Sequence, residues 1–113
     1  MIKVSGLTKY FDKFAAVKDV SFSVEQGNIY GFVGPNGAGK TTTLRMLATL
    51  LVPSGGEIHL NGVPALKNPL QVRRLLGYMP DFFGVYDDLK VDEYLEFYGE
   101  VSGRSLGDVR RDI

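Results

Sequence analysis

The sequence predicts an α/β fold, and two patterns of apolar residues carry this prediction. Residues 17–24 alternate apolar and polar side chains, which is the period of two expected of a half-buried strand. Residues 44–51 place apolar side chains three and four positions apart, which is the spacing of one helix face. Between them, an apolar run at residues 29–33 leads into a glycine-rich loop. A strand, a loop and a helix are therefore expected to follow one another.

The N-terminal part is expected to form antiparallel strands. Ile2–Leu7 predicts a first strand and Val17–Val24 a second, because both are rich in branched and apolar residues. Glu25–Asn28 carries a glycine and polar residues typical of a turn. The run Ile29–Val33 then predicts the strand that leads into the loop.

The helix after the loop is expected to begin at Lys40 and to end at the turn Pro53–Gly56, whose residues do not favour a helix. Gly56–Leu60 predicts a short strand. The dipeptide at residues 61–62, Asn-Gly, is a strong signal for a tight hairpin turn. A hairpin is therefore expected directly after the helix.

The remainder of the chain predicts one more strand and three helices. Asn68–Arg74 predicts a short helix, with its asparagine as N-cap and the following proline at the first helical position. Leu75–Met79 predicts a strand that ends at a proline. Val91–Val101 has the spacing of an amphipathic helix, and Ser105–Ile113 predicts a last helix with its serine as N-cap.

Composition bounds the class of protein. With 113 residues, 44% hydrophobic and 23% charged, the chain is one soluble domain or a piece of one. Thirteen basic residues balance thirteen acidic ones, so no overall field favours nucleic acid or an anionic membrane. No cysteine is present, which excludes disulfides and cysteine-based zinc sites. The longest apolar stretch, Leu44–Val52, contains an arginine and is too short to span a bilayer.

The glycine-rich loop, residues 34–41, reads G-P-N-G-A-G-K-T and matches the phosphate-binding pattern G-x-x-x-x-G-K-[ST]. Glycines at 34, 37 and 39 are expected to allow positive φ and a close approach of the backbone to an anion. Successive N–H groups and the start of the following helix then attract phosphate. Lys40 is expected to reach the β- and γ-phosphates, and the Thr41 hydroxyl to ligate Mg²⁺. The loop therefore predicts binding of a nucleoside triphosphate.

Longer stretches resemble the nucleotide-binding domain of ABC ATPases over nearly the whole chain. The opening L-T-K-Y-F-D-K-F-A-A-V-K-D-V-S-F-S-V-E-Q-G resembles that family's antiparallel strands, and G-P-N-G-A-G-K-T-T-T-L-R-M-L resembles its phosphate loop and helix. P-S-G-G-E-I-H-L-N-G is similar to the hairpin that follows. The resemblance implies an ABC-type P-loop NTPase core with ATP and Mg²⁺ as cofactors. The loop residues that it assigns to the nucleotide are Gly34, Pro35, Asn36, Gly37, Ala38, Gly39, Lys40, Thr41 and Thr42.

The resemblance also implies a contact with the adenine base. In the family, an aromatic side chain of the first loop stacks on adenine, and Phe11 matches that position, with Tyr10 as the alternative. A ring face offers a base about 1–3 kcal/mol of stacking free energy. Val17 is expected to pack on the base or sugar. An ordinary packing role for the aromatic residue remains the other reading.

The stretch L-L-G-Y-M-P-D-F-F-G-V-Y-D-D-L-K resembles the segment that holds the family's glutamine loop, but Asp81 stands where the family has glutamine. Its carboxylate offers oxygen ligands to Mg²⁺, although it cannot donate as an amide does. The alternative is a loop residue that forms a turn. This form of the segment looks most like ATP-binding subunits of ABC-2-type exporters. The neighbouring apolar residues are expected to receive the coupling helix of a transmembrane subunit: Phe82, Phe83, Val85 and Tyr86.

Several family motifs are not found in the sequence. It has no L-S-G-G-Q-type signature, no aliphatic run followed by Asp-Glu, and no switch histidine, since the single histidine, His59, lies in the hairpin. The chain is thus expected to be an incomplete core, the N-terminal part of such a domain. Its parts are residues 1–33 (strands), 34–52 (loop and helix), 53–80 (hairpin, short helix and strand) and 81–113 (glutamine-loop-like segment and start of the helical subdomain). Alone, it is expected to bind ATP poorly and to hydrolyse it at the background rate, because the base and second metal ligand are missing.

The expected function is the ATP-binding part of an ABC transporter, an ABC-type ATPase that works with a membrane subunit and a second ATP-binding subunit. It would lie in the cytoplasm, on the inner face of the cell membrane, and bind no nucleic acid. The alternatives are a soluble ABC-type ATPase of translation or DNA repair and a non-catalytic nucleotide-binding fragment. A small-molecule kinase or GTPase fits less well, since no N-K-x-D motif for guanine is present.

Overall fold

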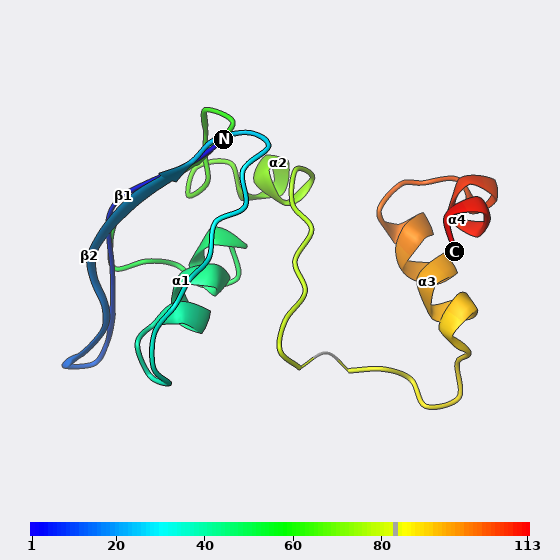
Figure 1. Cartoon of the computed structure of the whole chain (residues 1–113), viewed down its shortest axis with the longest axis horizontal. Coiled ribbons are helices and arrows are strands. Elements are labelled where there is room, and N and C mark those ends of the chain that lie inside the picture. The colour runs from blue at the N-terminus through cyan, green and yellow to red at the C-terminus, as the bar shows by residue number, and fades with distance from the viewer. Residues whose placement is uncertain (83) are drawn as a thin grey trace. The chain divides into compact units, whose positions relative to one another are not determined.

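The computed structural model describes residues 1–82 and 84–113. They divide into two compact units, Met1–Tyr78 and Met79–Ile113 (Figure 1). The first unit holds the sheet and the glycine-rich loop, and the second holds a pair of helices. The first unit combines an antiparallel sheet with two helices, which fits the α/β class that the sequence predicts.

The sheet of the first unit has four antiparallel strands in the order β2-β1-β3-β4. The long hairpin β1 (Ile2–Phe11) and β2 (Phe14–Val24) is the blue element in Figure 1. Strand β3 (Gly55–Leu60) pairs with the other edge of β1, and the short β4 (Val63–Pro64) closes the sheet. The antiparallel N-terminal part is therefore confirmed.

Both strands of the first hairpin are longer than the sequence indicated. Pairing continues beyond Leu7 because the register shifts between the two strands are absorbed by bulges. Gly6 and Asp19 have positive φ angles of 58° and 49°. The Gly6 N–H donates to Ser21 Oγ at 2.8 Å, and the Asp19 N–H donates to Thr8 Oγ1 at 3.0 Å. Side chains thus satisfy the backbone groups that the bulges free from the ladder.

In the first unit, one turn and the starts of two helices match the local predictions. The turn between β3 and β4 is the expected Asn-Gly hairpin, with φ angles of 47° at Asn61 and 79° at Gly62. Helix α2 (Pro69–Arg73) has Asn68 at its N-cap position and proline in its first turn, as predicted. Helix α1 (Lys40–Leu47) begins at the predicted lysine but ends well before the proline-glycine turn.

Two predicted strands are wrong as stated, because Ile29–Val33 and Leu75–Met79 carry no strand in the structure. An extended segment counts as a strand only when its N–H and C=O groups pair with a neighbour, and no described segment pairs with either. The first segment is nevertheless held on one side. The rings of Tyr30 and Phe32 pack on Phe22 of β2, with centroids 5.2 Å from it, and Ile29 and Val33 are fully exposed.

The core of the first unit lies between the sheet and α1, the helix that stands beside the hairpin in Figure 1. The sheet contributes Val4, Leu7 and Ile58, and α1 contributes Met46 and Leu47. From α2, Val72 reaches the same cluster and is completely buried. This core fixes the helix that follows the loop against the sheet that precedes it.

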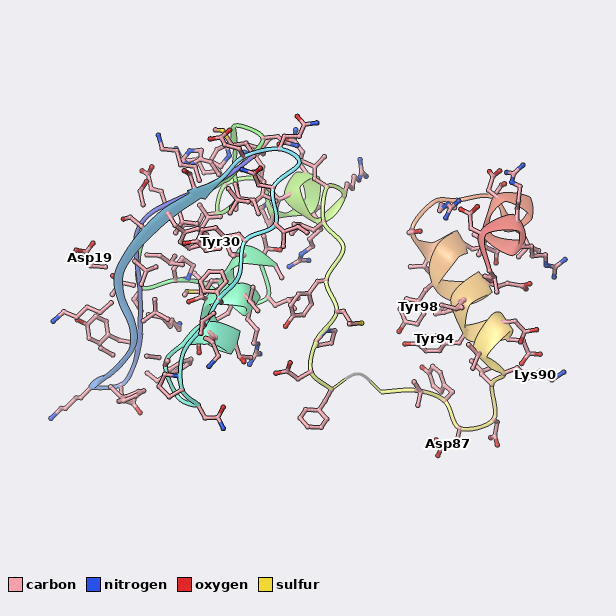
Figure 2. All side chains as sticks on the ribbon, viewed as in Figure 1. Asp19, Tyr30, Asp87, Lys90, Tyr94 and Tyr98 are labelled. Atoms are coloured by element: carbon pink, nitrogen blue, oxygen red, sulfur yellow. The ribbon has the colours of Figure 1, made fainter. Side chains whose placement is uncertain are left out.

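The second unit is a helical hairpin of α3 (Val91–Val101) and α4 (Leu106–Asp112), as predicted within a residue at the C-terminus. Ser105 Oγ accepts the Asp108 N–H, which confirms the predicted cap of α4. The helices approach closely where Gly99 faces Val109, which is buried. On α3, Tyr94 and Tyr98 lie one turn apart with ring centroids 4.7 Å from each other (Figure 2).

Candidate functional site

The glycine-rich loop owes its shape to three glycines that act in two different ways. Gly37 and Gly39 have φ angles of 83° and 89°, in the region that favours glycine. The expectation of positive φ is wrong for Gly34, where the backbone is ordinary. A Cβ atom there would stand 3.3 Å from the Cβ of Ala38, which is a tight contact, because the loop folds back on itself. The Ala38 N–H donates to Pro35 O at 3.2 Å and closes this turn.

Gly39, near the end of the loop, is the N-cap residue of α1. A Cβ atom on Gly39 would stand 2.5 Å from the Ala16 carbonyl oxygen and 3.0 Å from Val17 Cγ2. The backbone therefore passes directly against β2. Thr43 N–H donates to Gly39 O at 2.9 Å, which begins the helix, and the Thr43 side chain is buried.

The Lys40 ammonium group lies over the start of the loop. Its Nζ donates to Gly34 O at 2.5 Å and to Pro35 O at 2.7 Å. Lys40 is the first residue of α1, so its charge stands at the end of the helix where the free N–H groups also point. Within α1 as the structure describes it, no side chain caps this end and no acidic residue stands in the first turn. The Lys40 ammonium group and the unpaired backbone N–H groups of the first turn thus lie at the same end of the helix. This arrangement attracts a phosphate.

Two hydroxyl groups follow the lysine. Thr41 is exposed and Thr42 is half-buried, whereas the next threonine is part of the interior. An exposed hydroxyl in the first turn, beside the loop, is a hard oxygen donor of the kind that Mg²⁺ prefers. The described residues contain no cluster of three histidine, cysteine or acidic side chains around a common point. The chemistry of the Thr41 side chain therefore fits this metal.

The residues expected at the base lie near the end of the first hairpin. Phe11 is 47% exposed, and its ring lies 5.2 Å from Lys9 Nζ. Tyr10 is exposed as well, and successive strand residues face opposite sides of a sheet. Val17, by contrast, is only 5% exposed, and its side chain packs against Gly39. The adenine contacts of these residues remain predictions.

Asp81 and the apolar residues after it belong to the second unit, so the structure gives no distance between them and the loop. Asp81 is exposed and Phe82 is 95% exposed, while Phe83 lies outside the described residues. Val85 and Tyr86 line a shallow pocket of about 470 Å³ together with α3 residues. This pocket was not predicted from the sequence, although Leu89 and Val91 complete an apolar series with the predicted residues.

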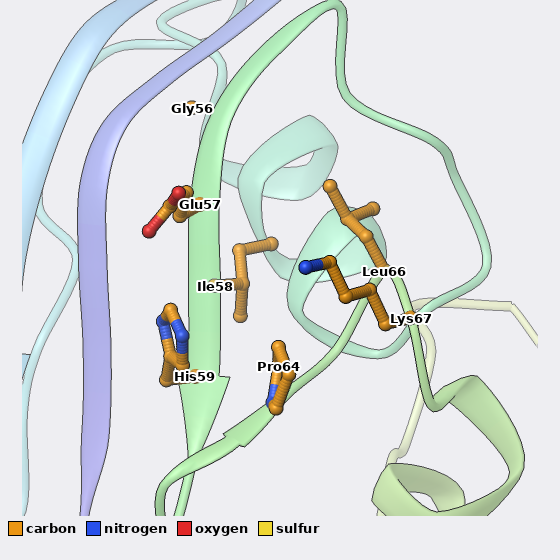
Figure 3. A pocket seen from close by; sticks show the side chains of 7 residues that line it. All are labelled: Gly56, Glu57, Ile58, His59, Pro64, Leu66 and Lys67. Atoms are coloured by element: carbon orange, nitrogen blue, oxygen red, sulfur yellow. The ribbon is translucent and has the colours of Figure 1, made fainter.

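His59 lies on β3 and lines a small pocket of about 290 Å³ with residues of β3, β4 and the segment that follows (Figure 3). Figure 3 shows Glu57 and His59 projecting from β3, with Lys67 coming from the segment after β4. The histidine is half-buried beside this pocket.

Comparison with known proteins shows the family to which this chain belongs. The sequence profile described as ABC transporter matches residues 17–111. The chain belongs to the ABC transporter family. Escherichia coli (strain K12) YbhF, described as a probable multidrug ABC transporter ATP-binding protein, is 42% identical over 91% of this chain and 18% of its own length. The Nod factor export ATP-binding protein I of Ralstonia nicotianae is 36% identical over 98% of this chain and 35% of its own.

Solved structures agree with the ABC assignment. The structure of an ATP-binding subunit of an ABC transporter superposes with a TM-score of 0.84, at 30% identity, over 97% of this chain and 46% of that one. This chain thus spans less than half the length of each of the relatives named above. Among its described residues, no helix is both long and apolar enough to cross a bilayer.

Proposed function

We propose that this chain supplies the ATP-binding loop of an ABC transporter subunit that hydrolyses ATP to move a solute through a membrane partner. The proposal rests mainly on one observation. The Lys40 ammonium group and the uncapped N-terminus of α1 lie together at the loop Gly34–Thr41. Family membership supports the same reading. Export is the direction we favour, in keeping with the ABC-2 resemblance and with a relative described as a Nod factor export protein.

In this proposal each loop group has a separate task. Backbone N–H groups of residues 36–41 bind phosphate oxygens, and Lys40 exchanges its bonds to Gly34 O and Pro35 O for bonds to the β- and γ-phosphates. Thr41 Oγ1 would hold Mg²⁺, and the Asp81 carboxylate would offer oxygen ligands of the kind that this metal prefers. When bound, the metal neutralises charge on the phosphate groups. Phe11 stacks on adenine, with Tyr10 as the alternative.

The second unit supplies the proposed contact with the membrane partner. Phe82, Val85 and Tyr86 are largely exposed, and the latter two continue into the pocket lined by Leu89 and Val91. Exposed apolar surface of this kind is typical of protein–protein interfaces. We propose that a transmembrane subunit covers it and that a second ATP-binding subunit pairs with this one. The chain would then lie on the inner face of the membrane.

The test is a comparison of ATP binding by the wild type and by Lys40→Ala, measured by calorimetry in the presence of Mg²⁺. Removing the only ammonium group at the loop is expected to weaken binding at least about tenfold, because a charge-assisted bond to phosphate is worth roughly 1.5–3 kcal/mol. Lys67→Ala removes a lysine that lines the pocket beside His59 and is the matched control. Equal ATP affinity of the wild type and Lys40→Ala, or no binding by the wild type, contradicts the proposed function.

A further inference from the structure

Helix α1 ends in a backbone turn that normally requires glycine. Leu50 N–H donates to Arg45 O at 2.9 Å and Thr49 N–H donates to Met46 O at 3.1 Å, which is the Schellman pattern of a helix C-terminus. The residue after the C-cap is Thr49, with a φ angle of 59°. A β-branched residue rarely adopts this left-handed conformation, because its side chain crowds the backbone. The end of the helix therefore holds strain that some other contact must offset.

Arg73 of α2 makes that contact. Its Nε donates to Thr49 Oγ1 at 2.8 Å, and its other guanidinium nitrogen donates to Thr49 O at 3.1 Å. The guanidinium group thus donates to both the side chain and the backbone of Thr49, and these two bonds fix the orientation of the guanidinium plane. Its positive charge also stands at the negative end of the α1 dipole.

The rest of the junction between α1 and α2 is only partly filled. Val72, the residue before Arg73, packs in the core with Met46 and Leu47. Beside it, a pocket of about 170 Å³ remains open, and Thr49 and Arg73 are among the residues that line it. The two hydrogen bonds of Arg73 thus cross the junction where apolar packing is incomplete.

We infer that Arg73 is a positioning residue for the phosphate loop, and this inference rests on the proposed function. Helix α1 has eight residues and is short enough to move as one rigid body. Its N-terminal end lies against β2 at Gly39, and its C-terminal end is held by Arg73. Fixing both ends sets the direction in which the first-turn N–H groups and the Lys40 ammonium group point. Arg73 itself does not touch the nucleotide.

The test uses the full chain and measures the dissociation constant of ADP for Arg73→Ala under conditions in which circular dichroism shows each variant folded. Affinity is expected to fall about two- to thirtyfold, the range typical of residues that act on a site through another element. Arg73→Lys, which keeps the charge and can make one bond, is expected to lie between wild type and Arg73→Ala. Arg74→Ala removes the neighbouring arginine and serves as the matched control.

Thr49→Gly separates positioning from a general loss of stability. Glycine adopts the left-handed conformation without strain, so the helix end no longer depends on the guanidinium group. In the Thr49→Gly background, Arg73→Ala (or Arg73→Lys, where the alanine variant is unfolded) is expected to change ADP affinity less than about twofold, and less than the same substitution does in the threonine background.

The outcomes are distinguishable from one another. A wild type that binds no ADP refutes the proposed function. A wild type that binds ADP as tightly as Arg73→Ala and Arg73→Lys refutes the positioning role alone. An arginine effect that is as large with glycine at position 49 as with threonine refutes the clamp on the strained turn.

Discussion

Gly39 lies so close to the Ala16 carbonyl group of β2 that a Cβ atom at position 39 would stand 2.5 Å from the Ala16 oxygen. Ordinary contacts of this kind are longer by about an ångström. The contact joins a residue of the phosphate loop to the first part of β2, twenty-three positions earlier in the chain. The loop is therefore shaped by the sheet as well as by its own sequence.

Gly39→Ala is expected to destabilise the first unit by roughly 2–5 kcal/mol, the sum of the left-handed conformation and of overpacking against β2. Urea unfolding followed by circular dichroism measures this. Gly37→Ala is the matched control, because Gly37 has nearly the same φ angle but no atom within 4 Å of its Cβ position. It should cost only about 1–2 kcal/mol. Equal losses for the two variants would mean that the contact with Ala16 is unimportant.

Leu7→Ala is expected to lower the free energy of unfolding by about 2–5 kcal/mol, because a fully buried leucine leaves a cavity when it is truncated. Leu7 lies at the centre of β1, between the sheet and α1. Leu70→Ala makes the same chemical change at a side chain that is 72% exposed, and should cost about 0.5 kcal/mol or less. Similar values for both positions would contradict the core described above.

Gly99→Ala is expected to separate α3 from α4. A Cβ atom at position 99 would stand 2.4 Å and 2.7 Å from the two Cγ atoms of Val109. Removing those atoms with Val109→Ala should relieve most of the clash, so the double variant is expected to be little less stable than Val109→Ala alone. Amide hydrogen exchange of the second unit reports the opening of the helix pair. Purely additive losses would show that the two residues are not in contact.

The second unit should become less stable in alkali. A hydrogen bond with Tyr98 raises the pKa of Tyr94 above its ordinary value. A raised pKa means that the folded form holds its proton more firmly than the unfolded form does. The resulting stability is therefore fully present below the ordinary pKa of about 10 and is lost as the pH rises through the pKa of the folded protein.

Tyr98→Phe tests this dependence, because it removes one hydroxyl group and keeps the ring. The tyrosinate absorbance of the variant should appear at lower pH than that of the wild type, beyond what the loss of one tyrosine explains. The loss of stability between about pH 9 and pH 11, around the ordinary tyrosine pKa, should also be smaller. Phe97→Leu is a control that changes an adjacent ring without touching this bond. Identical titrations of wild type and Tyr98→Phe would refute the assignment.

Prediction from the sequence succeeded where a structure depends on neighbouring residues. The Asn-Gly turn after β3, the start of α1 at Lys40 and the cap at Ser105 were all predicted at the correct positions. Each requires a particular backbone conformation or a bond within four residues, and the residue types that favour it are local. The bulges of the first hairpin were missed, because they depend on the register of two strands.

For the candidate site, the sequence by itself determined the loop, its lysine and its family, because phosphate binding needs few residue types at fixed spacing. Only the tertiary structure decided what holds the loop in place: the contact of Gly39 with Ala16, and the bonds of Arg73 to Thr49. It also decided that Ile29–Val33 forms no paired strand. The physical reason is common to all three, since each depends on residues distant in sequence, and no local pattern records which distant groups will meet.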